Sequence, residues 1–311
     1  MAAKRSGGVS GEAVWLDGRF VAWSDANVHI LTHTLHYGLG VFEGIRCYRT
    51  ADGRSAVFRL SDHVRRLFDS AHINLLKIPF SPSEIEAAIL ETLRRNRLEE
   101  GYVRPIVFIG DGEMGLNPAA NPIRVGVIAW AWGKYLGEDS LENGIRAKVS
   151  SFSRHHVNAK MTKGKTCGDY VNSILAKREA LLDGYDEAIM LDVNGQVSEA
   201  SGENVFLVRD GVLSTPPLLT VLDGITRATV IELARDKGVP AQERPVTRDE
   251  LYIADELFLT GTAAEVTPIR EVDRRTIGDG RRGRVTRLLQ TAFFDVVAGR
   301  DAKYERWLSY V

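Results

Sequence analysis

Hydrophobic and polar positions follow two different periods in the first half of the chain. Apolar residues recur at helical spacing over residues 61–75 and 82–96, and the second run begins at Ser-Pro-Ser-Glu, which is typical of a helix start. Uninterrupted apolar runs rich in β-branched residues predict buried strands over 102–109 and 124–132. Strand-like residues on both sides of an Asp-Gly pair predict a hairpin over 13–23. This half is expected to place helices beside an antiparallel sheet.

The second half is richer in predicted strands. Residues 226–237 form an amphipathic pattern that predicts a helix ended by Gly238, and helices are also expected over residues 170–182 and 284–297. Strand-like runs occupy residues 145–152, 187–193, 204–208, 212–215 and 256–260. The third and fourth of these runs flank an Asp-Gly turn, which predicts a second hairpin.

Glycines and charged residues interrupt both periods between the two halves. We therefore expect a smaller α+β domain over 1–136, an interdomain loop over 137–144 and a larger, β-rich domain over 145–311. A chain of 311 residues is long enough to form two packed cores.

The composition is that of an ordinary globular protein, with 44% hydrophobic residues, 26% charged residues and a net charge of −1. This balance argues against a nucleic-acid or membrane-surface partner. Cys47 and Cys167 lie far apart without CxxC spacing, which suits a reducing compartment. The first residues are polar, with no signal-peptide pattern, and no apolar run is long enough to span a membrane. We therefore expect a cytoplasmic protein whose partners are small molecules and copies of itself.

Two segments bring a primary amine and a carboxylate into surroundings of small residues: Lys165-Thr-Cys-Gly-Asp-Tyr170 and Glu199-Ala-Ser-Gly-Glu-Asn204. A lysine that forms a Schiff base needs a desolvated site or a nearby cation, so that its neutral form becomes accessible. A carboxylate that pairs with a pyridinium nitrogen is the other requirement of pyridoxal-phosphate chemistry. Each residue alone is weak evidence, because most charged residues are simply solvated.

The segment Gly224-Ile-Thr226 opens a predicted helix, where free backbone N–H groups favour an anion such as phosphate. The alternative is an ordinary helix cap by Thr226. The run Thr260-Gly-Thr-Ala-Ala264 offers further backbone donors after a predicted strand. Arg59 could supply positive charge, although an arginine at a strand end is often only solvated.

Two other patterns point less clearly to a site. His29, His33 and His36 would share a face if they were helical, but no HExxH pattern is present and Thr32 and Thr34 indicate a loop or strand. We therefore expect no metal site. The glycines of residues 110–115 lack the GxGxxG register of a dinucleotide-binding turn and indicate a flexible loop.

Seven motifs stand in a fixed order along the chain. They are Val41-Phe-Glu-Gly-Ile-Arg-Cys-Tyr48, Tyr102-Val-Arg-Pro105, Gly110-Asp-Gly-Glu-Met-Gly-Leu-Asn-Pro118, the Lys165 segment, Ser198-Glu-Ala-Ser-Gly-Glu-Asn204, Gly224-Ile-Thr226 and Thr260-Gly-Thr-Ala-Ala-Glu265. This set resembles the class IV (fold-type IV) aminotransferases, and most of all the branched-chain amino acid aminotransferases. The resemblance extends from about residue 15 to 307. It implies the two-domain α+β fold of D-amino acid aminotransferase, with the larger domain binding the cofactor.

The resemblance also implies roles around pyridoxal 5'-phosphate. Lys165 looks like the lysine that forms the Schiff base and moves the substrate proton, and Glu199 like the partner of the ring nitrogen. Tyr170 is similar to the partner of the phenolic oxygen, and Leu222 to the side chain against the ring. The residues that match the phosphate cup are Arg59, Ile225, Thr226 and Thr262. Lys160 and Lys163 are rival amines, but only Lys165 stands five residues before Tyr170 in the family's register.

For the substrate, the resemblance assigns Tyr102 and backbone N–H groups near Thr262 and Ala263 to the α-carboxylate. Arg104 lies two residues from Tyr102 on the same predicted strand, so both side chains should share a face. Arg104 would then bind the γ-carboxylate of glutamate, although a structural pairing with Asp111 is the alternative. Apolar walls with polar rims are expected from Tyr37, Phe42, Trp132, Tyr135 and Tyr170. Leu116 is suggested to reach a neighbouring subunit's pocket.

The activity implied by the resemblance is a reversible, ping-pong transamination of L-leucine, L-isoleucine and L-valine with 2-oxoglutarate. The alternatives share the fold: a D-amino acid or R-amine transaminase, or an aminodeoxychorismate lyase. A non-catalytic relative would be expected to lack Lys165 or Glu199. Family resemblance further implies a homodimer, and a hexamer of three dimers stays open.

Overall fold

The computed structural model describes residues 9–133, 136–137 and 139–311, which form two compact units. The first unit is made of two segments of the chain, one up to Gly133 and the other Ala298–Val311. The second unit continues from there to Val297. Within the described residues, no helix is both long enough and apolar enough to cross a membrane.

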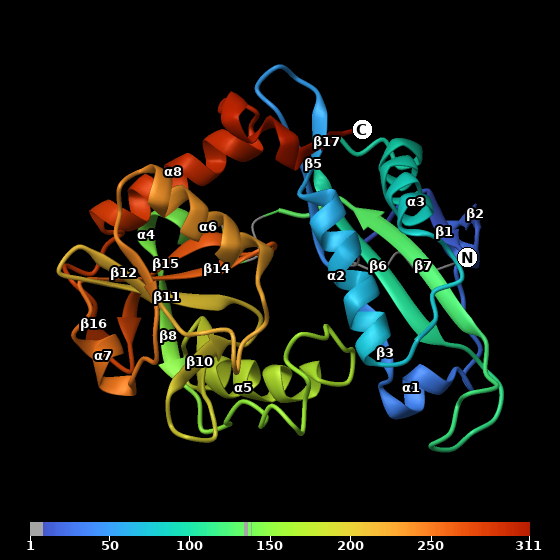
Figure 1. Cartoon of the computed structure of the whole chain (residues 1–311), viewed down its shortest axis with the longest axis horizontal. Helices are drawn as coiled ribbons and strands as arrows, with labels where there is room; N and C mark the ends of the chain where they lie inside the picture. Colours follow the sequence, from blue (N-terminus) through green and yellow to red (C-terminus); the bar gives the residue numbers. More distant parts are fainter. Residues whose placement is uncertain (1–8, 134–135, 138) are drawn as a thin grey trace. The chain divides into compact units, whose positions relative to one another are not determined.

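An antiparallel sheet of eight described strands forms the first unit (Figure 1). Its strands are β1 (Ala13–Leu16), β2 (Arg19–Ala22), β3 (Gly40–Phe42), β4 (Ile45–Arg49), β5 (Ser55–Phe58), β6 (Gly101–Ile109), β7 (Ile123–Trp130) and β17 (Leu308–Tyr310). Their order is β17-β5-β4-β6-β7-β1-β2, and β3 pairs with β6. The predicted hairpin of β1 and β2 is present, and its turn residues Asp17 and Gly18 both have positive φ, at 50° and 89°.

Two amphipathic helices cover this sheet, α2 (Leu60–Ile73) and α3 (Pro82–Arg95). Ser81 caps α3: its hydroxyl accepts a hydrogen bond from the Glu84 N–H, while the Glu84 carboxylate accepts one from the Ser81 N–H. The apolar faces of both helices join a core with the inward residues of β4, β6 and β7. Short 3-10 turns lie at Trp23–Asp25 and Ala302–Trp307.

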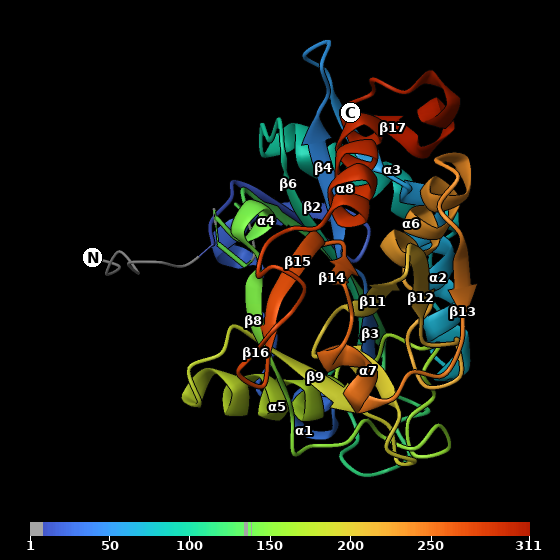
Figure 2. The same cartoon turned by 90° about the vertical axis from the view of Figure 1, so that its left-hand side faces the viewer.

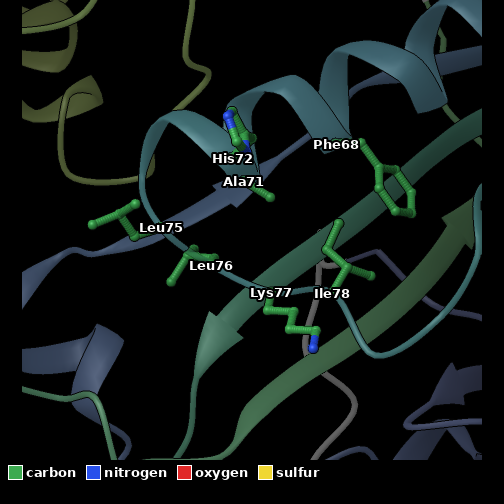
Figure 3. Close-up of a pocket in the computed structure, with 7 residues that line it drawn as sticks. All are labelled: Phe68, Ala71, His72, Leu75, Leu76, Lys77 and Ile78. Carbon is green, nitrogen blue, oxygen red and sulfur yellow. The ribbon is translucent and has the colours of Figure 1, made fainter.

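The helix α2 ends two residues before the predicted end, and it ends without a glycine. The N–H of Leu76 donates to the carbonyl of Ala71, and the N–H of Leu75 donates to that of His72. This is the Schellman pattern, and it holds Leu75 at a φ of 57° with its side chain 92% exposed. Figure 3 shows the shallow hollow that this turn leaves beside Leu75 and Leu76. The sequence carries no stop signal here, so periodicity alone placed the end too late.

The prediction of a loop or strand around Thr32 and Thr34 was wrong, because this segment contains the helix α1 (His33–Tyr37). The rings of His33 and Tyr37 contact each other at a tilt, with centroids 4.5 Å apart, as residues four positions apart in a helix can. Gly38, with a φ of 76°, ends the helix. A helix of five residues is too short to show a hydrophobic period.

A mixed sheet of nine described strands forms the second unit. Its strands are β8 (Ile145–Val149), β9 (Glu187–Leu191), β10 (Val197–Ala200), β11 (Asn204–Arg209), β12 (Val212–Thr215), β13 (Ala241–Glu243), β14 (Glu256–Gly261), β15 (Glu265–Val272) and β16 (Arg275–Thr276). Their order is β10-β9-β8-β15-β14-β11-β12-β13, and β16 pairs with β15. The central strands β11, β14 and β15 are buried over most of their length, and β8 is buried at alternate residues, so this sheet is the core of the unit.

The helices of the second unit are α4 (Ser140–Asn143), α5 (Tyr170–Leu182), α6 (Ile225–Asp236), α7 (Arg248–Tyr252) and α8 (Arg284–Val297). The bounds of α5 and α8 are those predicted from the sequence. Helices α6 and α8 pack against each other and against β14, while α5 lies along β9 (Figure 2). These contacts fix the N-terminal ends of α5 and α6 on the sheet, and both ends carry predicted site residues.

The described contacts differ from the expected domain division in two places. We expected residues 145–311 to form one domain, but Ala298–Val311 packs with the first unit because β17 pairs with β5 and extends that sheet. The expected interdomain loop contains α4, which packs on β15 within the second unit. A strand pairing between residues this far apart leaves no mark on local hydrophobic patterning.

Candidate active site

Lys165 and Tyr170 meet at the start of α5 in the second unit. The Nζ atom of Lys165 donates a hydrogen bond to the hydroxyl of Tyr170 at 2.5 Å, and both side chains are half-buried. Tyr170 is the first residue of α5, and its position follows from the predicted bounds of that helix. The spacing of five residues therefore brings an amine and a phenol into direct contact.

Glu199 lies on β10 with its side chain 5% exposed, and three groups fix its carboxylate. An Nη2 hydrogen of Arg154 is donated to Oε1 at 2.5 Å. The Nδ2 amide of Asn204 and the backbone N–H of Leu222 donate to Oε2 at 3.3 Å and 3.1 Å. The structure thus brings Glu199 together with Leu222, another predicted site residue, and the ion pair with Arg154 compensates the buried charge.

Sequence reasoning missed Arg154. This arginine is buried, and its Nη1 donates to Ser173 Oγ at 2.7 Å while its Nε has no partner among the described atoms. It follows β8 in the unremarkable run Ser-Phe-Ser-Arg, where a charged residue is normally read as a solvated loop residue. Only its fold-dependent approach to Glu199 identifies it.

The two rival lysines have different surroundings. Lys163 is exposed, and its Nζ donates to the backbone carbonyls of Leu218 and Val221. Lys160 is buried, and burial lowers its pKa to about 8, with the positive charges of Arg154 and Lys165 adding to this effect. Lys163 is therefore a loop anchor, whereas Lys160 adds positive charge near Lys165.

The N-terminus of α6 presents open backbone donors. Gly224 is its N-cap residue and provides no side-chain cap, so the alternative in which Thr226 caps the helix is not realised. Ile225 and Thr226 form the first turn and are buried. A Cβ atom at Gly224 would lie 1.9 Å from Oδ1 of Asn204, so only glycine fits here. First-turn N–H groups without intrahelical partners form an anion site.

Thr262 and Ala263 lie in the same unit, in the short connection between β14 and β15, and are half-buried. Two residues earlier, the Oγ1 of Thr260 is buried without a hydrogen-bond partner among the described atoms. A buried hydroxyl without a partner is costly unless a ligand or water satisfies it. This connection therefore supplies polar groups that the protein itself leaves open.

In the first unit, Tyr102 and Arg104 lie on β6 and share a face, as their spacing predicted. The guanidinium carbon of Arg104 lies 4.5 Å from the centre of the Phe42 ring and 5.7 Å from that of Tyr102. Trp132 contacts Tyr102 edge-on, with ring centres 4.5 Å apart. Four of the predicted substrate residues therefore form one cluster.

Arg104 forms no ion pair within the described part of the chain, so the alternative pairing with Asp111 is not realised there. Its Nε is buried and has no hydrogen-bond partner among the described atoms. A guanidinium held over two aromatic rings with open donors can receive a carboxylate.

A buried ion cluster supports this aromatic wall and was not predicted. Glu43, on the segment between β3 and β4, is fully buried, with His63 Nδ1 at 2.7 Å and Arg66 Nε at 2.6 Å from its carboxylate. Burial alone would raise the pKa of Glu43, but Arg66 and His63 hold the pKa well below its usual range. The ionised carboxylate therefore ties the segment of Phe42 and Gly44 to α2.

The tie matters because Gly44 lies directly against Tyr102. A Cβ atom at position 44 would come within 1.8 Å of the Tyr102 hydroxyl, so a side chain there would displace the phenol. The carboxylate of Glu43 also accepts a hydrogen bond from the Gly44 N–H at 3.2 Å. The Val41–Tyr48 motif was the available sequence signal, but it does not reveal that Glu43 is buried.

Arg59, Tyr37 and Leu116 lie outside these clusters. Arg59 precedes α2, where its Nε donates to Asp62 at 2.6 Å and its guanidinium lies 4.8 Å from the centre of the Trp307 ring. Tyr37 on α1 and Leu116 on the loop after β6 are exposed, by 45% and 91%. Tyr135 lies outside the described residues.

Glu203 is a buried acid near the end of the Glu199 segment. It lies close to Glu187, whose carboxylate binds Lys177 Nζ at 2.5 Å and Ser201 Oγ at 2.6 Å. Burial raises the pKa of Glu203 from 4.5 to about 8, and the negative charge of Glu187 contributes. The folded chain thus keeps a proton on Glu203 that the unfolded chain releases near pH 4.5.

We expect the Glu203→Gln variant to lose one component of the pH dependence of stability. Between pH 4.5 and 8 the folded state binds the extra proton, so the wild-type free energy of unfolding should fall with rising pH, by at most about 1.4 kcal/mol per pH unit. Glutamine imitates the protonated acid and has no proton to lose. Urea unfolding at pH 5.5, 6.5 and 7.5 measures how the free energy of unfolding changes with pH in the wild type and in Glu203→Gln. The Glu100→Gln variant, which changes an exposed glutamate, is the control. Equal slopes in all three proteins would contradict the buried proton.

Comparison with known proteins agrees with this arrangement. A family model described as amino-transferase class IV matches residues 40–272, well over half of the chain. Together with the lysine, tyrosine and glutamate described above, this match defines a class IV aminotransferase.

The relatives narrow the class further. The chain is 53% identical to a branched-chain-amino-acid aminotransferase of Pseudomonas aeruginosa, over 96% of this chain and 97% of that protein. It is 46% identical to the enzyme of the same name from Escherichia coli strain K12, with the same coverage. The crystal structure of an E. coli branched-chain amino acid aminotransferase matches with a TM-score of 0.94 at 45% identity, over 96% of this chain and 99% of that one.

A further match is the crystal structure of the T.th. branched-chain amino acid aminotransferase complexed with N-(5'-phosphopyridoxyl)-L-glutamate, with a TM-score of 0.94 at 46% identity. It covers 97% of this chain and 99% of that one. The chain belongs to the branched-chain-amino-acid aminotransferase family. The family, the fold class and the enzyme class predicted from the sequence are thereby confirmed.

Proposed function

We propose that this enzyme transfers the amino group of L-leucine, L-isoleucine or L-valine reversibly to 2-oxoglutarate, with pyridoxal phosphate as cofactor. The main support for this proposal is the contact of Lys165 Nζ with the Tyr170 hydroxyl, because it places an amine next to a phenol as the cofactor chemistry requires. The second support is the buried carboxylate of Glu199, which Arg154 holds in place.

The residues of the second unit fit the cofactor. Its aldehyde needs an amine, which Lys165 provides, and its ring nitrogen needs a carboxylate, which Glu199 provides. Its phosphate fits the open N–H groups of Ile225 and Thr226 at the glycine-capped start of α6. We assign the Leu222 side chain to the face of the cofactor ring. We assign Thr262 and Arg59 to the phosphate as further contacts.

When bound, pyridoxal phosphate takes up the amino group and withdraws electrons from the substrate's Cα. The Lys165 amine is the base that removes the Cα proton, and the Tyr170 hydroxyl holds that amine in position. Arg154 and Lys160 are both buried beside this part of the site, and each carries positive charge that can attract anionic groups. Arg154 acts as a positioning residue, because it fixes the carboxylate of Glu199 and touches no predicted substrate group.

The first unit supplies the specificity. We assign Tyr102 to the substrate's α-carboxylate, together with the backbone N–H of Ala263. Arg104 would bind the γ-carboxylate of glutamate through its open donors, while Phe42 and Trp132 offer apolar surface to leucine. We also propose that Tyr37, Tyr135 and Leu116 contact the substrate, with Leu116 reaching the pocket of a neighbouring subunit.

We also propose that the enzyme works as a homodimer or as a larger assembly of dimers, such as a hexamer. Large apolar side chains of the first unit are exposed, among them Ile30 by 73%, Leu35 by 61% and Leu116 by 91%. Leu35 also lines an apolar hollow with Val28 and Ile128, and a contiguous exposed apolar surface marks an interaction site. A cytoplasmic location is proposed as well, and the two free cysteines, Cys47 and Cys167, suit it.

The absorption spectrum of the purified holoenzyme tests the activity. We expect L-leucine, added without an oxo acid, to replace the visible band of the bound cofactor with the shorter-wavelength band of pyridoxamine phosphate. Adding 2-oxoglutarate should then restore the first band. A band that ignores L-leucine but responds to a D-amino acid or an R-amine would contradict the substrate class. Absence of any band after adding cofactor would contradict the assignment of Lys165.

A further inference from the structure

Four arginines line a pocket of about 620 Å³ in the second unit, where α4, β15 and the start of α8 meet (Figure 1). They come from β15, from the connection that follows β16, and from α8. We call this the arginine pocket, and its lining residues are Glu142, Asn143, Arg270, Gly280, Arg281, Arg282 and Arg287.

The charges of this pocket are not balanced. Within the described part of the chain, none of the four arginines forms an ion pair, and Glu142 is the single acid in the lining. The nearby acid Asp279 is turned to the backbone, where it accepts a hydrogen bond from the Arg281 N–H at 3.1 Å. This excess is local, because the whole chain has a net charge of −1. Guanidinium groups left together without acids attract an anion.

Two of the guanidinium groups are held in place by buried structure. Arg282 Nη1 donates to Oε1 of Gln290 at 2.6 Å, and Gln290 is only 3% exposed. The Nε2 of Gln290 donates in turn to the carbonyls of Leu141 and Val266, at 2.9 Å and 2.8 Å. Arg270 Nη1 donates to the carbonyl of Gly144 at 3.0 Å. These bonds use one nitrogen of each fork, so other donors remain for a ligand.

The other two arginines are free to adapt. Arg281 and Arg287 are exposed and flank the organised pair. Arg287 also lines a neighbouring hollow of about 540 Å³ that contains Lys237 and Arg284, so the positive surface continues along α8. A fixed pair with an adaptable pair beside it suits a ligand larger than a single phosphate ion.

We propose that the arginine pocket binds a small, multiply charged oxyanion. Planar guanidinium forks match the oxygen geometry of both phosphate and carboxylate groups, so the shared chemistry is several anionic oxygens on one small molecule. The volume lies within the range of small-molecule sites, while the charged lining excludes an apolar ligand. Two sources share this chemistry: phosphorylated metabolites and polycarboxylates.

Isothermal titration calorimetry tests the proposal on the holoenzyme. The enzyme is saturated with pyridoxal phosphate and dialysed, so that the catalytic phosphate site is filled. It is then titrated separately with inorganic pyrophosphate and with citrate at low ionic strength. We expect saturable binding at one site per chain, weakened by added salt. Tighter binding of pyrophosphate would identify phosphate groups as the ligand's chemistry, and tighter binding of citrate would identify carboxylates.

Matched variants locate the binding. The Arg281→Gln/Arg287→Gln variant removes two exposed guanidinium groups that make no hydrogen bond or ion pair with the described residues. It should weaken binding at least about tenfold. The Arg178→Gln/Arg235→Gln variant removes two exposed charges elsewhere in the unit and should bind like the wild type. Equal affinity in the two variants, or no saturable binding of either probe, would overturn the proposal.

Discussion

Replacing Lys165 by alanine is expected to abolish transamination while leaving the fold intact. The Lys165 amine is the proposed base at the substrate's Cα, and it donates a hydrogen bond to the Tyr170 hydroxyl. Loss of a general base and of a covalent partner together should reduce kcat by about 10⁴-fold or more. Steady-state turnover with L-leucine and 2-oxoglutarate measures the loss, and circular dichroism with thermal unfolding checks the fold.

The neighbouring lysines provide the control. Lys163→Ala removes an exposed ammonium group that binds the carbonyls of Leu218 and Val221. Turnover should stay within about tenfold of the wild type, which is a small loss compared with the loss of a general base. Lys160→Ala tests the buried rival. If Lys165→Ala kept its activity and Lys160→Ala lost it, the reactive amine would be Lys160 and not Lys165.

Replacing Arg104 by leucine should separate the two kinds of substrate. The guanidinium lies over Phe42 with open donors, so glutamate and 2-oxoglutarate would lose a charge-assisted contact worth about 3 kcal/mol, or about 100-fold in kcat/KM. Leucine would lose little, because its side chain makes no use of that charge. Half-reaction rates with L-glutamate and with L-leucine give the two losses separately.

The Arg104→Lys variant is the matched control for charge. Lysine keeps a positive charge at the site but lacks the two-pronged guanidinium group of arginine. The loss of activity with glutamate should therefore be smaller in Arg104→Lys than in Arg104→Leu. An equal loss for glutamate and leucine in Arg104→Leu would mean that Arg104 supports the aromatic wall of Phe42 and Tyr102 and does not select substrates.

Sequence patterns predicted those elements whose signal is local. The turn at Asp17-Gly18 needs two positive φ angles, and this dipeptide tolerates both, so the first hairpin was predicted correctly. The extent of α5 and the capped start of α3 at Ser81 were equally readable. The pairing of β17 with β5 was not predicted, because it joins residues more than two hundred positions apart.

The site follows the same division. Lys165 and Tyr170 were predicted together because the family resemblance gives both of them roles at the cofactor. Tyr102 and Arg104 were predicted together because a strand places alternate residues on one face. Arg154 could not be found in this way, since its approach to Glu199 depends on how β8 and β10 lie in the sheet. Buried charges whose partners are remote in sequence look like surface charges until the fold is known.

The pairing of β17 with β5 also makes the first unit discontinuous, with the whole second unit inserted within it. During synthesis the chain emerges from its N-terminus, so the second unit is complete before the last strand of the first unit exists. Until then, β5 is an unprotected edge that can pair with another nascent chain. Emergence of β17 from the ribosome is therefore the step that closes this edge and ends the exposure of the first unit to aggregation.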